Sequence, residues 1–171
     1  MSDHPHQAAR ARATRATNHF ELFGLPVRYQ LDRELLSTRY VELTRATHPD
    51  FAGTDAEAQV QAMELSARIN EAHAVLDDDL RRAEYLLQLR GGTIGEKASP
   101  DLLERIFEMR EALSGALSSG DKSQAAAIRA QAANWLQQVV SEAGTHLDRG
   151  DNQKAQELLS AGRYIRKIVT S

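Results

Sequence analysis

The chain has 171 residues, 42% of them hydrophobic, enough for one ordinary domain or two small ones with a buried core. Its formal net charge of -3, from 21 basic and 24 acidic residues, gives no electrostatic reason to expect a nucleic acid or an anionic membrane as partner. The absence of cysteine excludes disulfides, thiolate nucleophiles and cysteine-ligated zinc or iron–sulfur sites.

The first 17 residues carry Arg10, Arg12 and Arg15 among alanine and threonine, a composition that mitochondrial targeting peptides share. Asp3 and Pro5 count against such a peptide, and we expect this segment to be a disordered tail. No run approaches the ~18 apolar residues of a membrane span, and the apolar core of a secretory signal is missing. We therefore expect a cytoplasmic protein without a membrane partner. A mitochondrial matrix location is the alternative if the source is eukaryotic.

Two helices are predicted after the tail. Asn18 is a preferred N-cap residue, and Gly24 followed by Pro26 ends the first helix after a few apolar positions. Asp32 caps the second helix, which extends to about Thr47. Its apolar positions recur with helical spacing and predict one buried face.

A long amphipathic helix is predicted from Asp55 onward, because apolar residues recur there every three or four positions. We expect it to pack antiparallel against the second helix. The apolar positions are Ala58, Ala62, Leu65, Ile69, Ala72 and Leu76. The acidic triplet Asp77-Asp78-Asp79 is unfavourable at a helix C-terminus and suits the N-terminus of a further short helix, so we expect a break there.

Three glycines within residues 91–95 disfavour regular structure, and we place a linker over residues 91–99. Three helices are predicted after it, at Pro100 to Ser118, Lys122 to Arg149 and Asn152 to Val169. The connections between these three helices are short, and short connections favour antiparallel packing of consecutive helices. No stretch alternates with a period of two, so we expect an all-α chain of two helical bundles.

The tripeptide His48-Pro49-Asp50 falls between the second and third predicted helices. Proline ends the preceding helix and restricts the loop, so an imidazole and a carboxylate are displayed at the tip of a helical hairpin, where a partner can bind them. By itself the tripeptide is a weak signal, because it occurs by chance in roughly one or two chains in a hundred of this length. An ordinary turn is the alternative.

The order and spacing of four segments resemble a J-domain. These segments are Phe20-Glu21-Leu22-Phe23-Gly24-Leu25, Arg39-Tyr40, His48-Pro49-Asp50 and Ile69-Asn70-Glu71-Ala72. The resemblance implies a co-chaperone that docks on a DnaK-type chaperone and triggers ATP hydrolysis without doing bond-making chemistry itself. It implies His48, Pro49 and Asp50 as the stimulatory residues, and Arg39 and Arg45 as docking charges.

Glu42 lies three residues from both Arg39 and Arg45 and can pair with either inside the helix. The alternative for the two arginines is therefore that they are ordinary solvated helix charges. The chain departs from the usual J-domain pattern at Thr47, where an aromatic residue is common, and at Phe51, where a lysine is common.

The second half of the chain resembles the HscB family of J-domain co-chaperones. The segments that carry this likeness are Arg82-Ala83-Glu84-Tyr85-Leu86-Leu87 and Phe107-Glu108-Met109-Arg110-Glu111-Ala112-Leu113, and the length fits that family almost end to end. The resemblance implies an L-shaped molecule, with a J-domain over residues 18–90 and a C-terminal three-helix domain over 100–171. That domain would bind the iron–sulfur scaffold protein IscU, with HscA as the chaperone.

Function follows from the same resemblance. We expect a co-chaperone that delivers IscU to HscA and stimulates the HscA ATPase, aiding maturation of iron–sulfur proteins, as a monomer without a cofactor. A helical adaptor unrelated to chaperones, a J-domain protein for another client and a small helical enzyme are the alternatives.

The resemblance also implies a scaffold-binding surface made of Leu103, Phe107, Glu108, Glu111 and Tyr164. The first four lie along one side of a single helix and offer a mixed apolar and acidic surface. The alternative is that the two apolar members are bundle core, although Leu102, Ile106, Met109 and Leu113 already form a second apolar set. The chain departs from the family pattern at Glu104, often methionine, and at Gly115, often acidic.

Metal binding by His4 and His6, or by His48 with Asp50, lacks a third ligand at any helical spacing. No serine, histidine and acid set and no glycine-rich phosphate loop can be assembled, so we expect no enzyme. Trp135 with its apolar neighbours is more typical of bundle core than of a ligand pocket.

Overall fold

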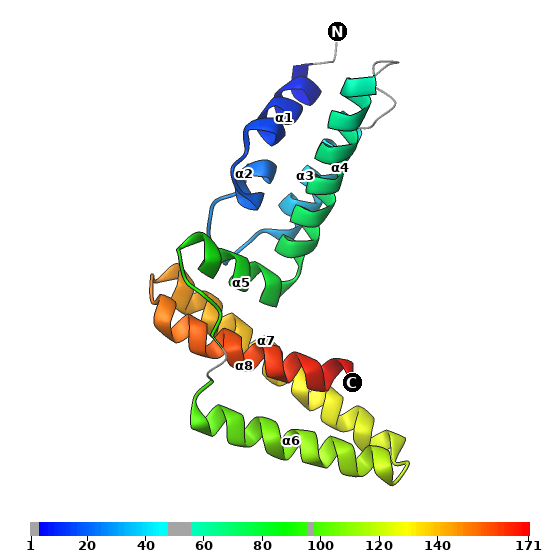
Figure 1. Cartoon of the computed structure of the whole chain (residues 1–171), viewed down its shortest axis with the longest axis vertical. Helices are drawn as coiled ribbons and strands as arrows, with labels where there is room; N and C mark the ends of the chain where they lie inside the picture. The colour runs from blue at the N-terminus through cyan, green and yellow to red at the C-terminus, as the bar shows by residue number, and fades with distance from the viewer. Residues whose placement is uncertain (1–3, 48–55, 96–97) are drawn as a thin grey trace. The chain divides into compact units, whose positions relative to one another are not determined.

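The computed structural model describes residues 4–47, 56–95 and 98–171, and the regular structure within these ranges is entirely α-helical (Figure 1). The all-α prediction is confirmed. The helices are α1 (His4–Arg15), α2 (His19–Phe23), α3 (Arg33–Ala46), α4 (Ala56–Asp77), α5 (Asp79–Leu89), α6 (Pro100–Ser118), α7 (Lys122–Asp148) and α8 (Asn152–Thr170). Within the same ranges, no helix combines the length and hydropathy that a bilayer crossing requires.

The chain divides into two compact units, residues 1–78 and 79–171. In the first unit, α1, α2 and α4 each contact other helices of that unit, and α3 contacts all three of them. In the second unit, α7 and α8 form the largest contact, and α5 and α6 each pack on both of them. The division falls between α4 and α5, whereas the sequence suggested the glycine-rich segment after α5.

Helix α5 belongs to the second unit because it is attached to α8 by packing and by charge. Gly162 of α8 has no side chain, and a Cβ there would lie 3.2 Å from Cδ1 of Leu80, so the glycine allows close approach. Glu84 of α5 accepts a hydrogen bond from Nε of Arg163 at 2.6 Å. Neither contact is visible in local sequence patterns, since the partners are about 80 residues apart in the chain.

The N-terminal segment corrects one prediction. A disordered tail was expected over the first 17 residues, but His4–Arg15 forms the helix α1, which contacts α2 and α3. Its inward positions are Ala9 and Ala13, both buried. The prediction was wrong because two alanines give almost no hydrophobic periodicity, and the contacts that hold this helix come from residues distant in sequence.

Local capping agrees with the sequence in the first unit. The side chain of Asn18 accepts a hydrogen bond from the backbone N–H of Glu21 at 2.9 Å, and Asp32 accepts one from the N–H of Leu35 at 3.0 Å. Gly24 ends α2 with φ 66°, a left-handed conformation that favours glycine. The core beneath these caps includes Phe20, Leu22, Phe23, Leu36, Leu43, Ile69, Ala72 and Leu76.

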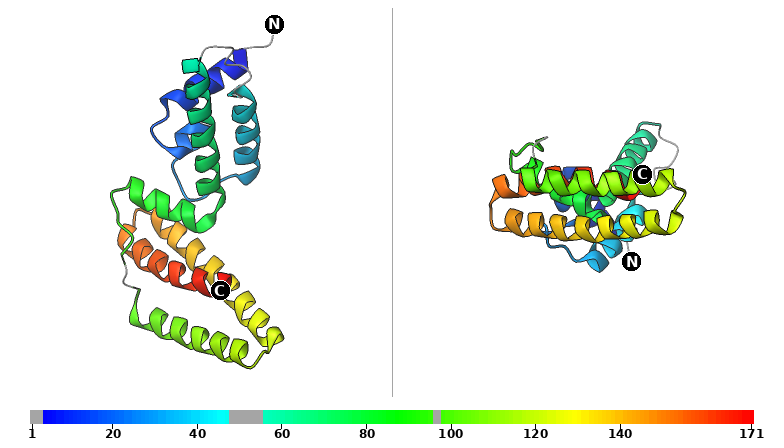
Figure 2. Two further views of the ribbon diagram at one scale, coloured as in Figure 1. Left: turned by 45° about the vertical axis from the view of Figure 1, so that its right-hand side comes forward. Right: turned by 90° about the horizontal axis from the view of Figure 1, so that it is seen from below.

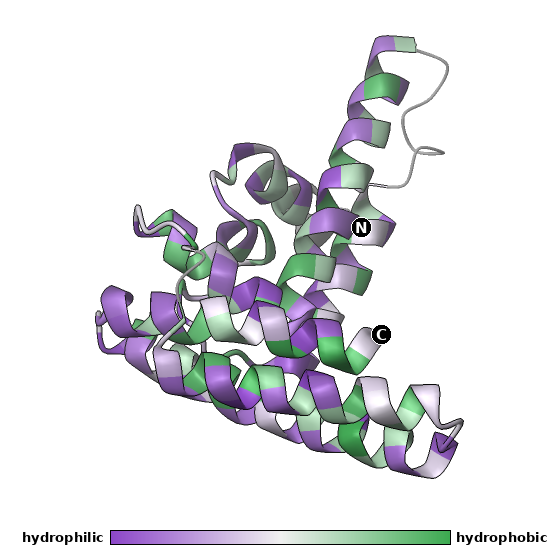
Figure 3. Cartoon of the chain, turned by 60° about the horizontal axis from the view of Figure 1, so that its bottom comes forward, coloured by the Kyte–Doolittle hydropathy of each residue, from purple (hydrophilic) through white to green (hydrophobic). Residues whose placement is uncertain are grey.

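The second unit contains the predicted antiparallel helices. Their bounds match the expected ones within one residue, and Asp121 and Asp151 cap α7 and α8 through their side chains. Figure 2 shows α6 alongside α7, and Figure 3 shows apolar and polar positions alternating along the helices. Trp135 is buried with Val139 and Val140, which agrees with their predicted place in the bundle core.

Candidate partner-binding surfaces

The two predicted docking arginines occupy different environments on α3. Arg39 is half-buried, with 37% of its side chain exposed, and its Nη1 lies 3.1 Å from Oε2 of Glu42. Arg45, in the last turn, is exposed. Six positions separate the two arginines, which places them about 120° apart around the helix. The anticipated pairing with Glu42 is thus present at Arg39.

The end of α3 is well defined by its hydrogen bonds. Thr47, which stands where an aromatic residue is common, is buried, and its Oγ1 donates to the carbonyl of Leu43 at 2.8 Å. Its backbone N–H donates to the same carbonyl at 3.0 Å. His48, Pro49 and Asp50 come directly after this cap and lie, together with Phe51, outside the described residues.

Helices α3 and α4, which precede and follow residues 48–55, are joined by a polar and aromatic contact. The ring centroids of Tyr40 and His73 are 4.2 Å apart, and the hydroxyl of Tyr40 donates to Oδ1 of Asn70 at 3.0 Å. His73 also meets the ring of Phe23 edge-on at 6.4 Å. These contacts support the predicted pairing of the two helices, because they lie along the α3–α4 interface.

A second helix, α1, contacts α3 and was not predicted from the sequence. Arg12 of α1 lies near Arg39, and burial lowers the pKa of Arg12 below its ordinary value, helped by the positive charge of Arg39 and opposed by Glu42. The spacing of Ala9 and Ala13 was the one available signal, and it is too weak to be recognised without the structure.

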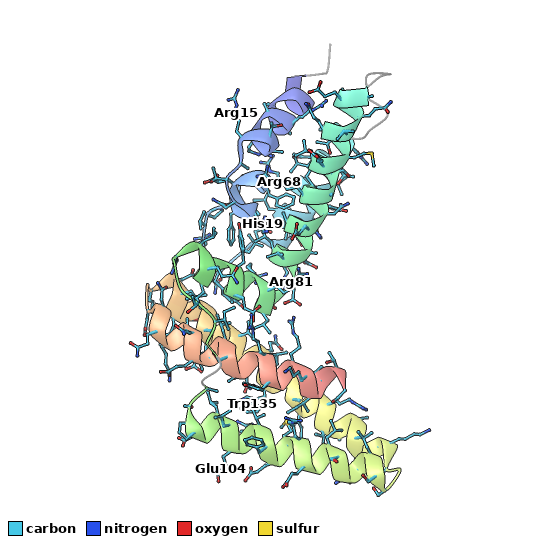
Figure 4. All side chains as sticks on the ribbon, viewed as in Figure 1. Arg15, His19, Arg68, Arg81, Glu104 and Trp135 are labelled. Carbon is cyan, nitrogen blue, oxygen red and sulfur yellow. The ribbon has the colours of Figure 1, made fainter. Side chains whose placement is uncertain are left out.

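The predicted scaffold-binding residues of α6 lie largely in solvent. Phe107 is 60% exposed, Glu108 and Glu111 are exposed, and Leu103 is half-buried. The buried side of this helix is formed by Ile106, Leu113 and Ala116. Phe107 is therefore not bundle core, and α6 does have two apolar sides. Glu104 points away from the helices behind it (Figure 4).

Tyr164, the remaining predicted member, comes from α8, which contacts α6. Its ring is half-buried and lies 5.5 Å from Nζ of Lys167. It borders an open groove of about 520 Å³, which is also lined by Leu80, Glu84, Ser160, Arg163 and Lys167. The structure thus places four predicted residues on one helix and the fifth on a neighbouring helix.

Within the described ranges, no group of three or more histidine, aspartate or glutamate side chains is arranged to hold a metal ion. In the first unit, α3 presents the exposed charge of Arg45. In the second unit, α6 presents the exposed ring of Phe107 beside the carboxylates of Glu108 and Glu111.

Comparison with known proteins gives consistent results. The family model described as "HSCB C-terminal oligomerisation domain" matches residues 98–171. The co-chaperone protein HscB homolog of Mannheimia succiniciproducens is 34% identical over 159 residues, covering 90% of this chain and 92% of that protein. The homolog of the same name from Vibrio cholerae is 38% identical over 159 residues and covers 88% of each chain.

Solved structures show the same likeness in three dimensions. The chaperone HscB from Vibrio cholerae is similar with a TM-score of 0.78 and 31% identity, over 90% of this chain and 94% of that one. The crystal structure of human co-chaperone protein HscB is similar with a TM-score of 0.79 and 25% identity, over 90% of this chain and 79% of that one.

Proposed function

Because the chain belongs to the HscB family of co-chaperones, we propose that it delivers the scaffold protein IscU to the DnaK-type chaperone HscA and stimulates the HscA ATPase. The observation that carries this proposal is the likeness to HscB co-chaperones over about nine tenths of the chain, which includes both compact units. A J-domain protein for another client is the remaining alternative.

The chaperone contact is assigned to the first unit. We infer that His48, Pro49 and Asp50 are the stimulatory residues and that Arg45, and more weakly Arg39, are docking charges. Support comes from the described neighbours of the tripeptide, since α3 and α4 are held together at Tyr40 and His73. Exposed arginine steers and orients an acidic partner without much stabilising the isolated protein.

The scaffold contact is assigned to α6, with Tyr164 of α8 as a flanking residue. Support comes from the exposure of Phe107, since a large aromatic side chain in solvent is a common anchor of a protein interface. Glu108 and Glu111 surround it with negative charge, which favours a scaffold surface rich in lysine or arginine. Residues 100–171 would thus form the scaffold-binding domain and residues 18–90 the chaperone-binding domain. Of the latter, α2, α3 and α4 belong to the first compact unit, whereas α5 packs within the second.

The remaining expectations are parts of the same proposal. The protein would act in the cytoplasm, do no bond-making chemistry and need no cofactor. We expect a monomer, and light scattering of the purified chain should give the mass of one copy. The matching family model is described as an oligomerisation domain. If light scattering gives the mass of a dimer, the expectation of a monomer is wrong and the proposed co-chaperone function stands.

The test is a steady-state ATPase assay of HscA with and without the full chain and IscU. We expect the chain to raise the rate of phosphate release, and IscU to raise it further when both are present. Purified IscU should also bind the chain directly in isothermal titration. Stimulation of HscA without any IscU binding would favour another client, and no stimulation would remove the proposal.

A further inference from the structure

Helix α1 packs on α3, the helix that carries the proposed docking charges. The contact is made by small side chains, because Ala13 is fully buried and Ala9 is nearly so, one helical turn apart. Alanine allows two helix backbones to approach closely, but its methyl group removes little apolar surface from water. The packing of α1 on α3 therefore has a small hydrophobic component.

Hydrogen bonds from one arginine anchor the C-terminal end of α1. Arg68 of α4 donates through Nη1 to the carbonyl of Ala13 at 3.4 Å, and through Nη2 to the carbonyl of Ala16 (Figure 4). Carbonyls at a helix C-terminus lack partners within the helix, and a cation there is favoured by the helix dipole. Nε of Arg12 also donates to the carbonyl of Leu22 at 3.4 Å, which joins α1 to the end of α2. The position of α1 thus depends on the hydrogen bonds of two arginine side chains more than on apolar packing.

Other groups oppose this packing. Arg12 and Arg39 bring two positive charges together. Burial is the larger cause of the lowered pKa of Arg12, and the charge of Arg39 lowers it further. Nη2 of Arg12 and Nε of Arg39 are buried, and the described residues offer neither of them a hydrogen-bond acceptor. Buried donors without partners destabilise the arrangement that buries them. We expect α1 to leave α3 far more readily than the apolar helices of the unit separate from one another.

We propose that α1 is an autoinhibitory cover, which hides the Arg39 side of α3 from the chaperone while it is docked and must leave for full-strength binding. This inference rests on the proposed function, because it concerns the regulation of the same docking helix. If α1 covers α3 in about nine molecules of ten, the apparent affinity for the chaperone is reduced about tenfold.

The test compares the same substitution at two positions of α1 in the full chain. Ala13 is buried and Ala11 is exposed, so Ala13→Gln should force the helix off α3 while Ala11→Gln should leave it docked. We expect Ala13→Gln to lower the concentration of the protein that half-maximally stimulates the HscA ATPase, by up to about tenfold. Ala11→Gln should behave as the wild type. An unchanged or higher value for Ala13→Gln would overturn the inference.

A second measurement does not depend on ATPase activity. The chain contains no cysteine, so Ala13→Cys introduces a single thiol whose alkylation rate reports how often α1 leaves α3. We expect slow alkylation of this variant, and faster alkylation when HscA and ATP are added. The exposed thiol of Ala11→Cys should react quickly in both conditions. Alkylation of Ala13→Cys that HscA slows or leaves unchanged would contradict the inference.

The outcomes separate this inference from the proposed function. If wild type and Ala13→Gln both stimulate HscA with equal half-maximal concentrations, the cover is excluded and the co-chaperone function stands. If neither stimulates HscA while both keep a helical circular dichroism spectrum, the proposed function fails and the inference fails with it.

Discussion

The guanidinium of Arg105 on α6 lies over the indole ring of Trp135 on α7, 4.2 Å from the ring centroid. Trp135 is buried, and the guanidinium of Arg105 covers one face of its ring. The contact joins α6 to α7 alongside the buried side of α6, which is formed by Ile106, Leu113 and Ala116 and leaves Phe107 in solvent.

Replacing Arg105 should therefore destabilise the second unit slightly. A cation over an aromatic ring at an exposed site contributes about 0.5–1 kcal/mol, and Arg105→Ala should lower the free energy of unfolding by about that amount. Urea titration monitored by tryptophan fluorescence measures it, because Trp135 is the single tryptophan of the chain. Arg110→Ala, at an exposed position of the same helix, is the control and should have a smaller effect.

Phe107 should contribute to IscU binding and little to folding. With 60% of the residue exposed, Phe107→Ala should change the free energy of unfolding by no more than about 0.5 kcal/mol. An interface anchor of this kind contributes about 2 kcal/mol or more to binding, so the Kd for IscU should rise about 30-fold or more. Isothermal titration measures the binding, and thermal unfolding measures the stability.

Two variants on the same helix serve as controls for Phe107. Leu117→Ala removes another exposed apolar side chain, outside the proposed surface, and should leave IscU binding intact. Leu113→Ala removes a buried one and should cost about 2–5 kcal/mol of folding stability. A Phe107→Ala variant that unfolds as readily as Leu113→Ala would favour a structural role for the phenylalanine.

His48→Gln should abolish stimulation of the HscA ATPase, because the amide cannot reproduce the donor and acceptor geometry of the imidazole at this position. The helical circular dichroism and the affinity for IscU should be unchanged, since the proposed scaffold surface lies on α6 and α8. Phosphate release at saturating co-chaperone is the measurement. Full stimulation by this variant would exclude the proposed role of the tripeptide.

The two arginines of α3 should differ in their effects on HscA. Arg45 is exposed, so Arg45→Ala should raise the half-maximal concentration for stimulation several-fold. Arg39 is half-buried beside Glu42, and Arg39→Ala should have a smaller effect. Raising the ionic strength should reduce the difference between wild type and Arg45→Ala, because salt screens exposed charges. Equal effects of both variants at low salt would contradict this prediction.

The stability of the first unit should depend on pH through Glu21. Its carboxylate accepts hydrogen bonds from the N–H and the hydroxyl of Thr17, at 2.9 and 2.7 Å, and these lower its pKa. Because the folded pKa lies below the unfolded one, the stabilisation is present above the ordinary glutamate range and is lost as pH falls through the folded pKa. Glu21→Gln should thus be less stable than wild type at neutral pH, and the difference should vanish at strongly acidic pH. Thermal unfolding across pH measures this, and a pH-independent difference would contradict it.

Much of this fold is determined by short stretches of sequence. The side chains of Asn18, Asp32, Asp121 and Asp151 cap the helices where the sequence predicted they would begin, because capping joins groups only a few residues apart. The apolar period likewise predicted which helices would be amphipathic. The order and spacing of the short segments that resemble a J-domain and HscB proteins were also enough to indicate the HscB family.

Tertiary structure decided which side chains remain available to a partner. The place of α1 against the first unit involves Arg68, which reaches the carbonyls of Ala13 and Ala16 from a distant part of the chain. The half-burial of Arg39 and the exposure of Phe107 depend in the same way on which neighbouring helices cover them. Local sequence specifies the hydrogen bonds and periodicity of a helix, whereas the coverage of its surface is set by contacts between segments far apart in sequence, which no local pattern encodes.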